Sequence, residues 1–198
     1  MNIYLIRHGR QNSRLCNVDV ELSKEGREQA DLLGKRLEKY DIEAVYSSQL
    51  IRAKETADII NTHLNKPRII DERWQEANFG GMTGLSNEEM KEKYGDYLEK
   101  RAKMIEDMPY PDGGENCRMV FERSFEALKD LTKEPYKNVC VVTHGGVLRA
   151  LITGIIDDEK MGTFHIERLN DFAHFEDKDY LLRKHFGSGF FNVKDIKK

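Results

Sequence analysis

Two histidines of this 198-residue chain stand where a short apolar run ends. His8 follows residues 3–6 and comes directly after Arg7, and His144 follows residues 139–143. A neutral imidazole held in place is suited to act as a nucleophile near neutral pH, and a guanidinium beside it is suited to bind a tetrahedral dianion. These residue types therefore predict a site for a phosphate group.

Arg52 and Glu76 are further candidates for this chemistry. Arg52 follows the apolar run that ends in Ser47-Ser48 and falls in the first turn of a predicted helix, so we expect it to project toward the same site. Phosphoryl transfer also needs an acid for the leaving oxygen. Glu76 is the candidate because it lies in a loop between Trp74 and Phe79, where desolvation favours the protonated form of a carboxyl group.

The elements that must position these residues alternate between strands and helices. We expect strands over residues 2–6, 44–46, 68–70 and 138–143, and helices over residues 24–40, 50–64, 116–132 and 146–154. Such alternation is typical of βαβ units, which build a mostly parallel sheet covered on both faces. The predicted fold class is α/β, a three-layer α/β/α sandwich, and its ligands are expected beyond the carboxyl ends of the strands.

Between residues 71 and 114 the alternation lapses. Gly80-Gly81 punctuates this stretch, and the spacing of Ser86 and Glu89 fits a capping box that opens a charged helix. We therefore interpret residues 1–198 as a single domain with a helical insertion at about 71–114. The tail after Gly162 has no clean period and is assigned to one or two terminal strands.

Composition narrows the class of partner and the compartment. The chain has 32 Lys and Arg against 35 Asp and Glu, a net charge of -3, which gives no support for a nucleic-acid or membrane partner. Three scattered cysteines argue against disulfides and zinc, and no apolar run is long enough to span a bilayer. We expect an unprocessed cytoplasmic protein without a metal, in which Phe190 and Phe191 are candidates for a homodimer contact.

The motifs resemble, in order, those of the histidine phosphatase superfamily of phosphoglycerate mutase type. They are the Arg-His-Gly (RHG) motif at residues 7–9 and the stretches 22–30, 46–57, 76–80, 113–115 and 143–146. The resemblance implies that His8 is the nucleophile that becomes phosphohistidine and that Glu76 donates a proton and then activates water. It also implies that Arg7, Arg52 and His144 hold the phosphate, and it implies no metal or cofactor.

Two departures from the family pattern bear on the substrate. Arg10-Gln11 stands where many members have Glu-Thr, and Arg14 stands where an asparagine commonly reaches the phosphate, with Asn12 two places earlier. We interpret Arg10, Asn12 and Arg14 as substrate-binding candidates, together with Gly145, whose lack of a side chain permits close backbone approach. The extra arginines indicate a substrate with negative charge beyond its scissile phosphate.

The function predicted on these grounds is hydrolysis of a small phosphate monoester. A phosphomutase, in which the phosphoenzyme donates to a second hydroxyl, is the alternative within enzymes, although the mutases of the family are typically longer. A non-catalytic module of the same fold that binds a phospholigand is the alternative from another class.

Overall fold

The computed structural model describes residues 1–103, 106–157, 164 and 166 of the chain. Four strands form one parallel sheet in the order β1-β4-β2-β3. The strands are β1 (Asn2–Arg7), β2 (Ala44–Ser47), β3 (Arg68–Ile70) and β4 (Asn138–Thr143). The predicted parallel sheet is confirmed, and β4 lies between β1 and β2 although it follows β3 in the sequence.

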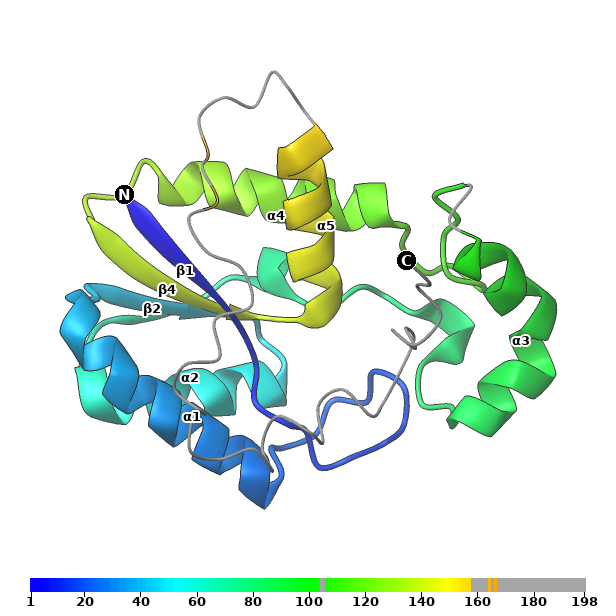
Figure 1. The fold of residues 1–198 in the computed structure, drawn as a ribbon, viewed down its shortest axis with the longest axis horizontal. Helices are drawn as coiled ribbons and strands as arrows, with labels where there is room; N and C mark the ends of the chain where they lie inside the picture. Colours follow the sequence, from blue (N-terminus) through cyan, green and yellow to red (C-terminus); the bar gives the residue numbers. More distant parts are fainter. Residues whose placement is uncertain (104–105, 158–163, 165, 167–198) are drawn as a thin grey trace, which may run out of the picture.

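Helices cover both faces of the sheet (Figure 1). One layer holds α1 (Lys24–Leu37) and α2 (Ile51–Leu64), and the other holds α4 (Cys117–Leu131) and α5 (Gly145–Asp157). The three-layer α/β/α sandwich is therefore confirmed. α5 begins one residue earlier and ends three residues later than the predicted helix over residues 146–154.

The central strand β4 is buried on both faces because its side chains alternate between two cores. Val139 and Val141 pack in the cluster that includes Val120 and Leu151 of α4 and α5. Cys140 and Val142 belong to the cluster on the side of α1 and α2. A continuous apolar run at residues 139–142 is what such a strand requires.

Side-chain caps fix where three helices begin. Ser23 accepts from the N–H of Gly26 at the start of α1, and Asn116 accepts from the N–H of Met119 at the start of α4. α2 is capped from a distance, because the carboxylate of Asp19 accepts from the N–H of Ile51 at 2.7 Å. That bond ties the loop after β1 to the helix that carries Arg52.

The stretch between β3 and α4 forms two 3-10 turns and one helix. These are η2 (Glu72–Trp74), η3 (Gly80–Met82) and α3 (Asn87–Ala102), which lies beside the sandwich (Figure 1). The predicted capping box of Ser86 and Glu89 is present. The predicted tail strands and the homodimer candidates Phe190 and Phe191 lie outside the described residues.

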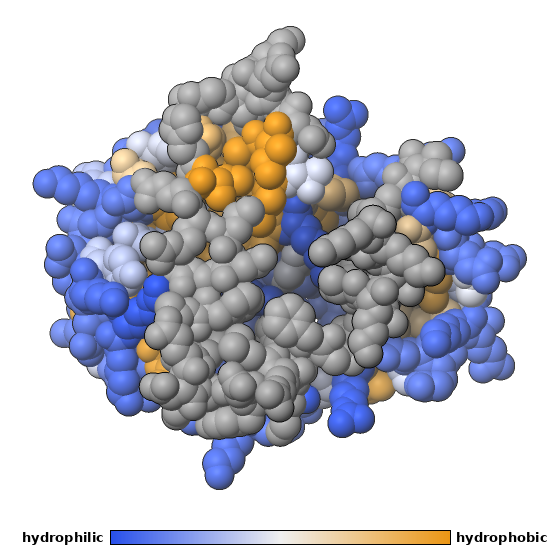
Figure 2. Space-filling model, viewed as in Figure 1, coloured by the Kyte–Doolittle hydropathy of each residue, from blue (hydrophilic) through white to orange (hydrophobic). Residues whose placement is uncertain are grey.

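The surface drawn in Figure 2 is mainly hydrophilic, with an apolar area over α5. Ile156 of that helix is 64% exposed. In the part of the chain that the structure describes, no helix has both the length and the apolar character that a membrane span requires.

Candidate functional site

The sheet order brings three strand ends together. β4 is paired with β1 so that Thr143 lies opposite Arg7, and with β2 so that Val142 lies opposite Ser47. Residues that follow these strands therefore meet at one edge. The imidazole rings of His8 and His144 have centroids 5.0 Å apart and are tilted by 53°.

The hydrogen bonds of His8 determine which ring nitrogen is free to react. Nδ1 lies 2.6 Å from the carbonyl oxygen of Gly9, so Nδ1 carries the hydrogen and donates it. Nε2 accepts from Nε of Arg52 at 3.3 Å. The neutral ring thus keeps the lone pair of Nε2 directed at the Arg52 guanidinium, at the buried edge where the two histidines meet.

Backbone contacts hold His8 in this position. Its N–H donates to the carbonyl of Thr143 at 2.9 Å, and the N–H of Gly9 donates to the hydroxyl of Thr56 on α2 at 3.0 Å. A Cβ at residue 9 would collide with the carbonyl oxygen of Gly26. The RHG motif therefore needs its glycine so that the chain can pass close to the start of α1.

Arg52 is almost fully buried and uses all its nitrogens. Besides the contact with His8, one terminal nitrogen donates to the carbonyl of Val18 at 3.0 Å and the other to Oδ1 of Asn17 at 2.7 Å. Burial lowers the pKa of Arg52, and the charges of Glu76 and Asp19 oppose this effect. The guanidinium is a fixed cation beside Nε2 of His8.

His144 is fully buried and neutral at neutral pH. Desolvation, followed by the charges of neighbouring cationic groups, lowers its pKa well below the usual 6.5. Nε2 lies 2.7 Å from the hydroxyl of Ser48, which also receives the N–H of Leu50 at 3.3 Å. Nδ1 of His144 is buried and has no hydrogen-bond partner among the described residues.

The carboxylate of Glu76 is held by backbone donors. Oε1 accepts from the N–H of Ala77 at 2.9 Å and from the N–H of Gly146, in the first turn of α5, at 3.0 Å. Oε2 has only a 3.3 Å contact with the same Gly146 N–H, so it is the freer oxygen. Burial lowers the pKa of both Arg7 and Arg52, and the charge of Glu76 opposes that effect on each, so the carboxylate lies near both cations.

Arg7 is the last residue of β1 and is exposed. Desolvation lowers the pKa of Arg7. The negative charge of Glu76 opposes this shift, and the positive charge of Arg149 on α5 lowers the pKa further. Gly145 lies against Arg7, since a Cβ at residue 145 would stand 3.7 Å from Nε of the arginine. His8, Arg52, His144, Glu76 and Arg7 are therefore brought together as the sequence predicts.

The substrate-binding candidates on the loop after His8 are arranged differently. The amide of Asn12 donates to the carboxylate of Glu21 at 3.0 Å. Arg14 is exposed, and Arg10 is partly buried with its backbone N–H on Gln29. The substrate-binding role of Arg10, Asn12 and Arg14 stays a prediction.

Asn17 and Ser48 are site residues that the sequence analysis missed. Asn17 accepts from Arg52 and donates to the carbonyl of Ala77 at 3.2 Å, so it links the cation to the loop that carries Glu76. Its φ of 48° lies in the left-handed region that asparagine tolerates. No sequence pattern distinguishes Asn17 from the other polar residues of its loop. Ser48 directly follows β2, so its position at a strand end is a recognisable signal.

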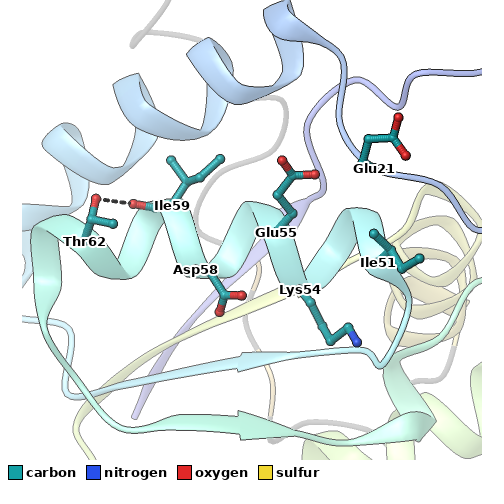
Figure 3. Close-up of a pocket in the computed structure, with 7 residues that line it drawn as sticks. All are labelled: Glu21, Ile51, Lys54, Glu55, Asp58, Ile59 and Thr62. Atoms are coloured by element: carbon teal, nitrogen blue, oxygen red, sulfur yellow. Dashed lines mark hydrogen bonds between the residues drawn. The ribbon is translucent and has the colours of Figure 1, made fainter.

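A surface depression of about 520 Å³ lies on α2 (Figure 3), and neither His8 nor His144 is among its lining residues. Its described lining includes three carboxylates, of Glu21, Glu55 and Asp58, against the single ammonium of Lys54. This charge balance disfavours a phosphate. In residues 1–103 and 106–157, no three side chains of His, Cys, Asp or Glu are grouped to hold a metal ion.

Residues 3–172 match the model of the histidine phosphatase superfamily (branch 1). The metal-independent phosphoserine phosphatase of Arabidopsis thaliana is 31% identical over 188 residues, which cover 91% of this chain and 79% of that protein. The 2,3-bisphosphoglycerate-dependent phosphoglycerate mutase of Cytophaga hutchinsonii is 31% identical over 189 residues, covering 88% and 82%. The structure of Bacillus stearothermophilus YhfR matches with a TM-score of 0.78 and 28% identity, over 88% of this chain and 98% of that one.

Proposed function

This chain belongs to the histidine phosphatase superfamily, and we propose that it hydrolyses a small phosphate monoester through a phosphohistidine on His8, without a metal. The observation that carries the proposal is the state of the His8 ring. Its Nε2 has a lone pair, because Nδ1 donates to Gly9, and it faces the buried cation of Arg52. A nucleophile beside a fixed positive charge is what attack on a phosphate dianion requires.

In the first step, Nε2 of His8 forms a bond to phosphorus while the bond from phosphorus to the ester oxygen breaks. Arg7, Arg52 and His144 stabilise the negative charge on the transferring group. Glu76 gives the departing oxygen a proton from Oε2, its freer oxygen. The products of this step are an alcohol, a phosphohistidine and an ionised Glu76.

In the second step, the ionised Glu76 removes a proton from water as the water oxygen attacks phosphorus. The bond between phosphorus and Nε2 of His8 breaks, and inorganic phosphate leaves with the ring restored to its neutral form. Glu76 is again protonated, so the two steps form a closed cycle. Dividing one slow hydrolysis into two assisted steps is the advantage of a covalent intermediate.

The substrate we propose carries a second anionic group. Arg10 and Arg14 stand on the loop that begins directly after His8 and Gly9, and Arg14 is exposed. The Arabidopsis relative is named for phosphoserine, whose carboxylate is such a group. An ester of this kind is the class of substrate that the arginines suit.

A phosphomutase is the second candidate, because the relative from Cytophaga hutchinsonii is named as one. In that reaction the phosphohistidine would pass its phosphoryl group to an acceptor hydroxyl instead of water. A hydroxyl acceptor added to the assay would then lower the yield of free phosphate and produce a new ester.

Release of inorganic phosphate from a panel of esters tests the proposal. The panel contains phosphoserine, glycerate phosphates, sugar phosphates and nucleotides, and it is run on the wild type and on His8→Gln. We expect release by the wild type and none by the variant. Binding of esters without turnover by the wild type would instead favour the non-catalytic phospholigand module.

A further inference from the structure

The backbone of the loop that carries Glu76 is fastened by one side chain of α4. The guanidinium of Arg123 donates to the carbonyl oxygens of Arg73 at 2.7 Å, Gln75 at 2.9 Å and Glu76 at 3.2 Å. These carbonyls belong to the turn that leads out of η2. Arg123 therefore fixes the backbone on both sides of the position where the Glu76 side chain begins.

Glu115 completes the same contact from the segment before α4. Its carboxylate accepts from Nε of Arg123 at 2.8 Å and from a terminal nitrogen at 3.0 Å, a bidentate pair in which both side chains are less than one-fifth exposed. Oε2 of Glu115 also accepts from the N–H of Asn78 at 2.8 Å. In return, the N–H of Glu115 donates to the carbonyl oxygen of Asn78 at 2.8 Å. The pair thus holds the chain from Arg73 to Asn78.

Arg123 has no donor left for a ligand. A guanidinium has five N–H groups, and the five bonds to Glu115 and to the three carbonyls use all of them. A direct role in binding phosphate is therefore excluded by its hydrogen bonding. The contribution of Arg123 to catalysis must pass through the loop that it holds.

The Glu76 carboxylate is fixed from the opposite direction by α5. Gly146 in the first turn of that helix donates to Oε1, and α5 packs alongside α4 (Figure 1). A Cβ at residue 146 would collide with the same oxygen, so the backbone approaches the carboxylate closely. The acid is held between two packed helices, with its main chain on Arg123 and its side chain on Gly146.

We propose that Arg123 and Glu115 are positioning residues for the general acid Glu76: they touch no reacting atom and determine where its carboxyl group meets the leaving oxygen. This inference rests on the proposed function, in which Glu76 protonates that oxygen. A misplacement of about 1 Å is enough to cost about 10²-fold in rate, so a pair that binds the backbone of four residues between Arg73 and Asn78 has a measurable effect.

The leaving group separates this role from a merely structural one. A p-nitrophenolate departs without a proton, whereas an alkoxide needs one, so loss of the acid slows alkyl phosphates more than p-nitrophenyl phosphate. The experiment measures kcat/KM, which reports the first chemical step, for both esters. The variants are Arg123→Lys, which keeps the charge but loses the planar fork, and Glu115→Gln, which keeps the shape but loses the charge.

We expect both variants to lower kcat/KM for the alkyl phosphate by about 10-fold to 10²-fold, part of the effect of a general acid, and to change it for p-nitrophenyl phosphate by less than about 3-fold. Arg118→Lys is the matched control, because Arg118 is exposed on the same helix and its pairing with Glu122 is loose, at 3.8 Å. It should leave both values unchanged. Thermal melting of each variant identifies any that fails to fold, in which case the other variant of the pair decides.

Glu76→Gln distinguishes the two ways in which the account can fail. If Glu76→Gln slows both esters equally, the acid role in the proposed function is wrong. If Glu76→Gln is selective for the alkyl phosphate while Arg123→Lys and Glu115→Gln slow both esters equally or neither, the positioning proposal is overturned and the proposed function stands.

Discussion

Nε of Arg52 lies 3.3 Å from Nε2 of His8, so the buried cation and the reactive nitrogen face each other directly. In the proposed reaction, attack on phosphorus uses the lone pair of Nε2 that accepts from Arg52. The Nε–H of Arg52 then loses His8 as its hydrogen-bond acceptor and donates to an oxygen of the phosphoryl group instead. The contact between Arg52 and Nε2 of His8 thus places the positive charge beside the group that is transferred in the proposed reaction.

This relationship predicts that Arg52→Lys is severely impaired although the charge is conserved. A lysine cannot reproduce bonds to His8, Val18 and Asn17 from one planar group. We expect kcat/KM to fall by about 10²-fold to 10³-fold, the effect of removing a preorganised donor. Arg27→Lys on the exposed Glu55 pair is the control and should leave the rate unchanged; equal rates for Arg52→Lys and the wild type would contradict the account.

Asn17→Ala should remove one of the contacts that hold the Arg52 guanidinium in place. The substitution removes the acceptor of Arg52 and the bond to the Ala77 carbonyl, so both the cation and the acid loop lose a contact. We expect a fall in kcat/KM of about 10-fold or more, together with some loss of stability because alanine is strained at the left-handed φ of residue 17. Asn61→Ala, which removes the cap on Lys66 at the end of α2, should lower stability and spare the rate. A reversed pattern would show that Asn17 has no part in the site.

The buried neutral state of His144 predicts a dependence of stability on pH. In the unfolded chain this imidazole takes up a proton below about pH 6.5, whereas in the folded protein its lowered pKa keeps it neutral to a more acidic pH. The unfolded state binds more protons in that window, so the free energy of unfolding falls as the pH is lowered through it, by up to about 1.4 kcal/mol per pH unit.

Urea unfolding of the wild type and of His144→Gln at a series of pH values measures this contribution. The variant keeps a polar partner for Ser48 but has no group that titrates there. Its free energy of unfolding should depend less steeply on pH below about 6.5. Parallel curves for the two proteins would mean that His144 does not hold its neutral form on folding.

Arg10 and Arg14 give a prediction about the substrate. If they bind a second anionic group, Arg10→Ala and Arg14→Ala raise KM about 10-fold for an ester that carries a carboxylate, since a charge-assisted hydrogen bond is lost. An uncharged alkyl phosphate should show no change. Unaltered kinetics of both variants on the natural substrate would refute a specificity role for this loop.

The sequence predicts the fold and the five central site residues because residues that follow the strands of a parallel sheet are expected at one edge of it. Apolar runs end at Arg7-His8, Ser47-Ser48 and Thr143-His144, and the carboxyl ends of parallel strands share one edge. The order of the strands does not follow from such runs. The continuous apolar run of β4 indicates a strand buried on both faces, but it does not tell which two strands lie beside it.

The residues that support the site are harder to predict. Asn12 and Asn17 are both asparagines of one polar loop, and only the folded path of that loop decides that Asn17 meets Arg52 while Asn12 meets Glu21. Arg123 binds backbone carbonyls about fifty residues away in the sequence. Because every residue has a backbone carbonyl, the residue types do not show which carbonyls it binds. Long-range contacts with the main chain are therefore the part of the site that sequence reasoning loses.

Trapping the covalent intermediate tests the central claim most directly. The wild type is mixed with a turned-over ester and quenched within milliseconds in alkali, because phosphohistidine survives base and is lost in acid, and the protein is then mapped by mass spectrometry. We predict one phosphoryl group on His8, its absence in His8→Gln, and its presence in His63→Gln, whose ring pairs with Asp31 away from the site. Continued turnover with the phosphoryl group on another residue, or on none, would contradict the account.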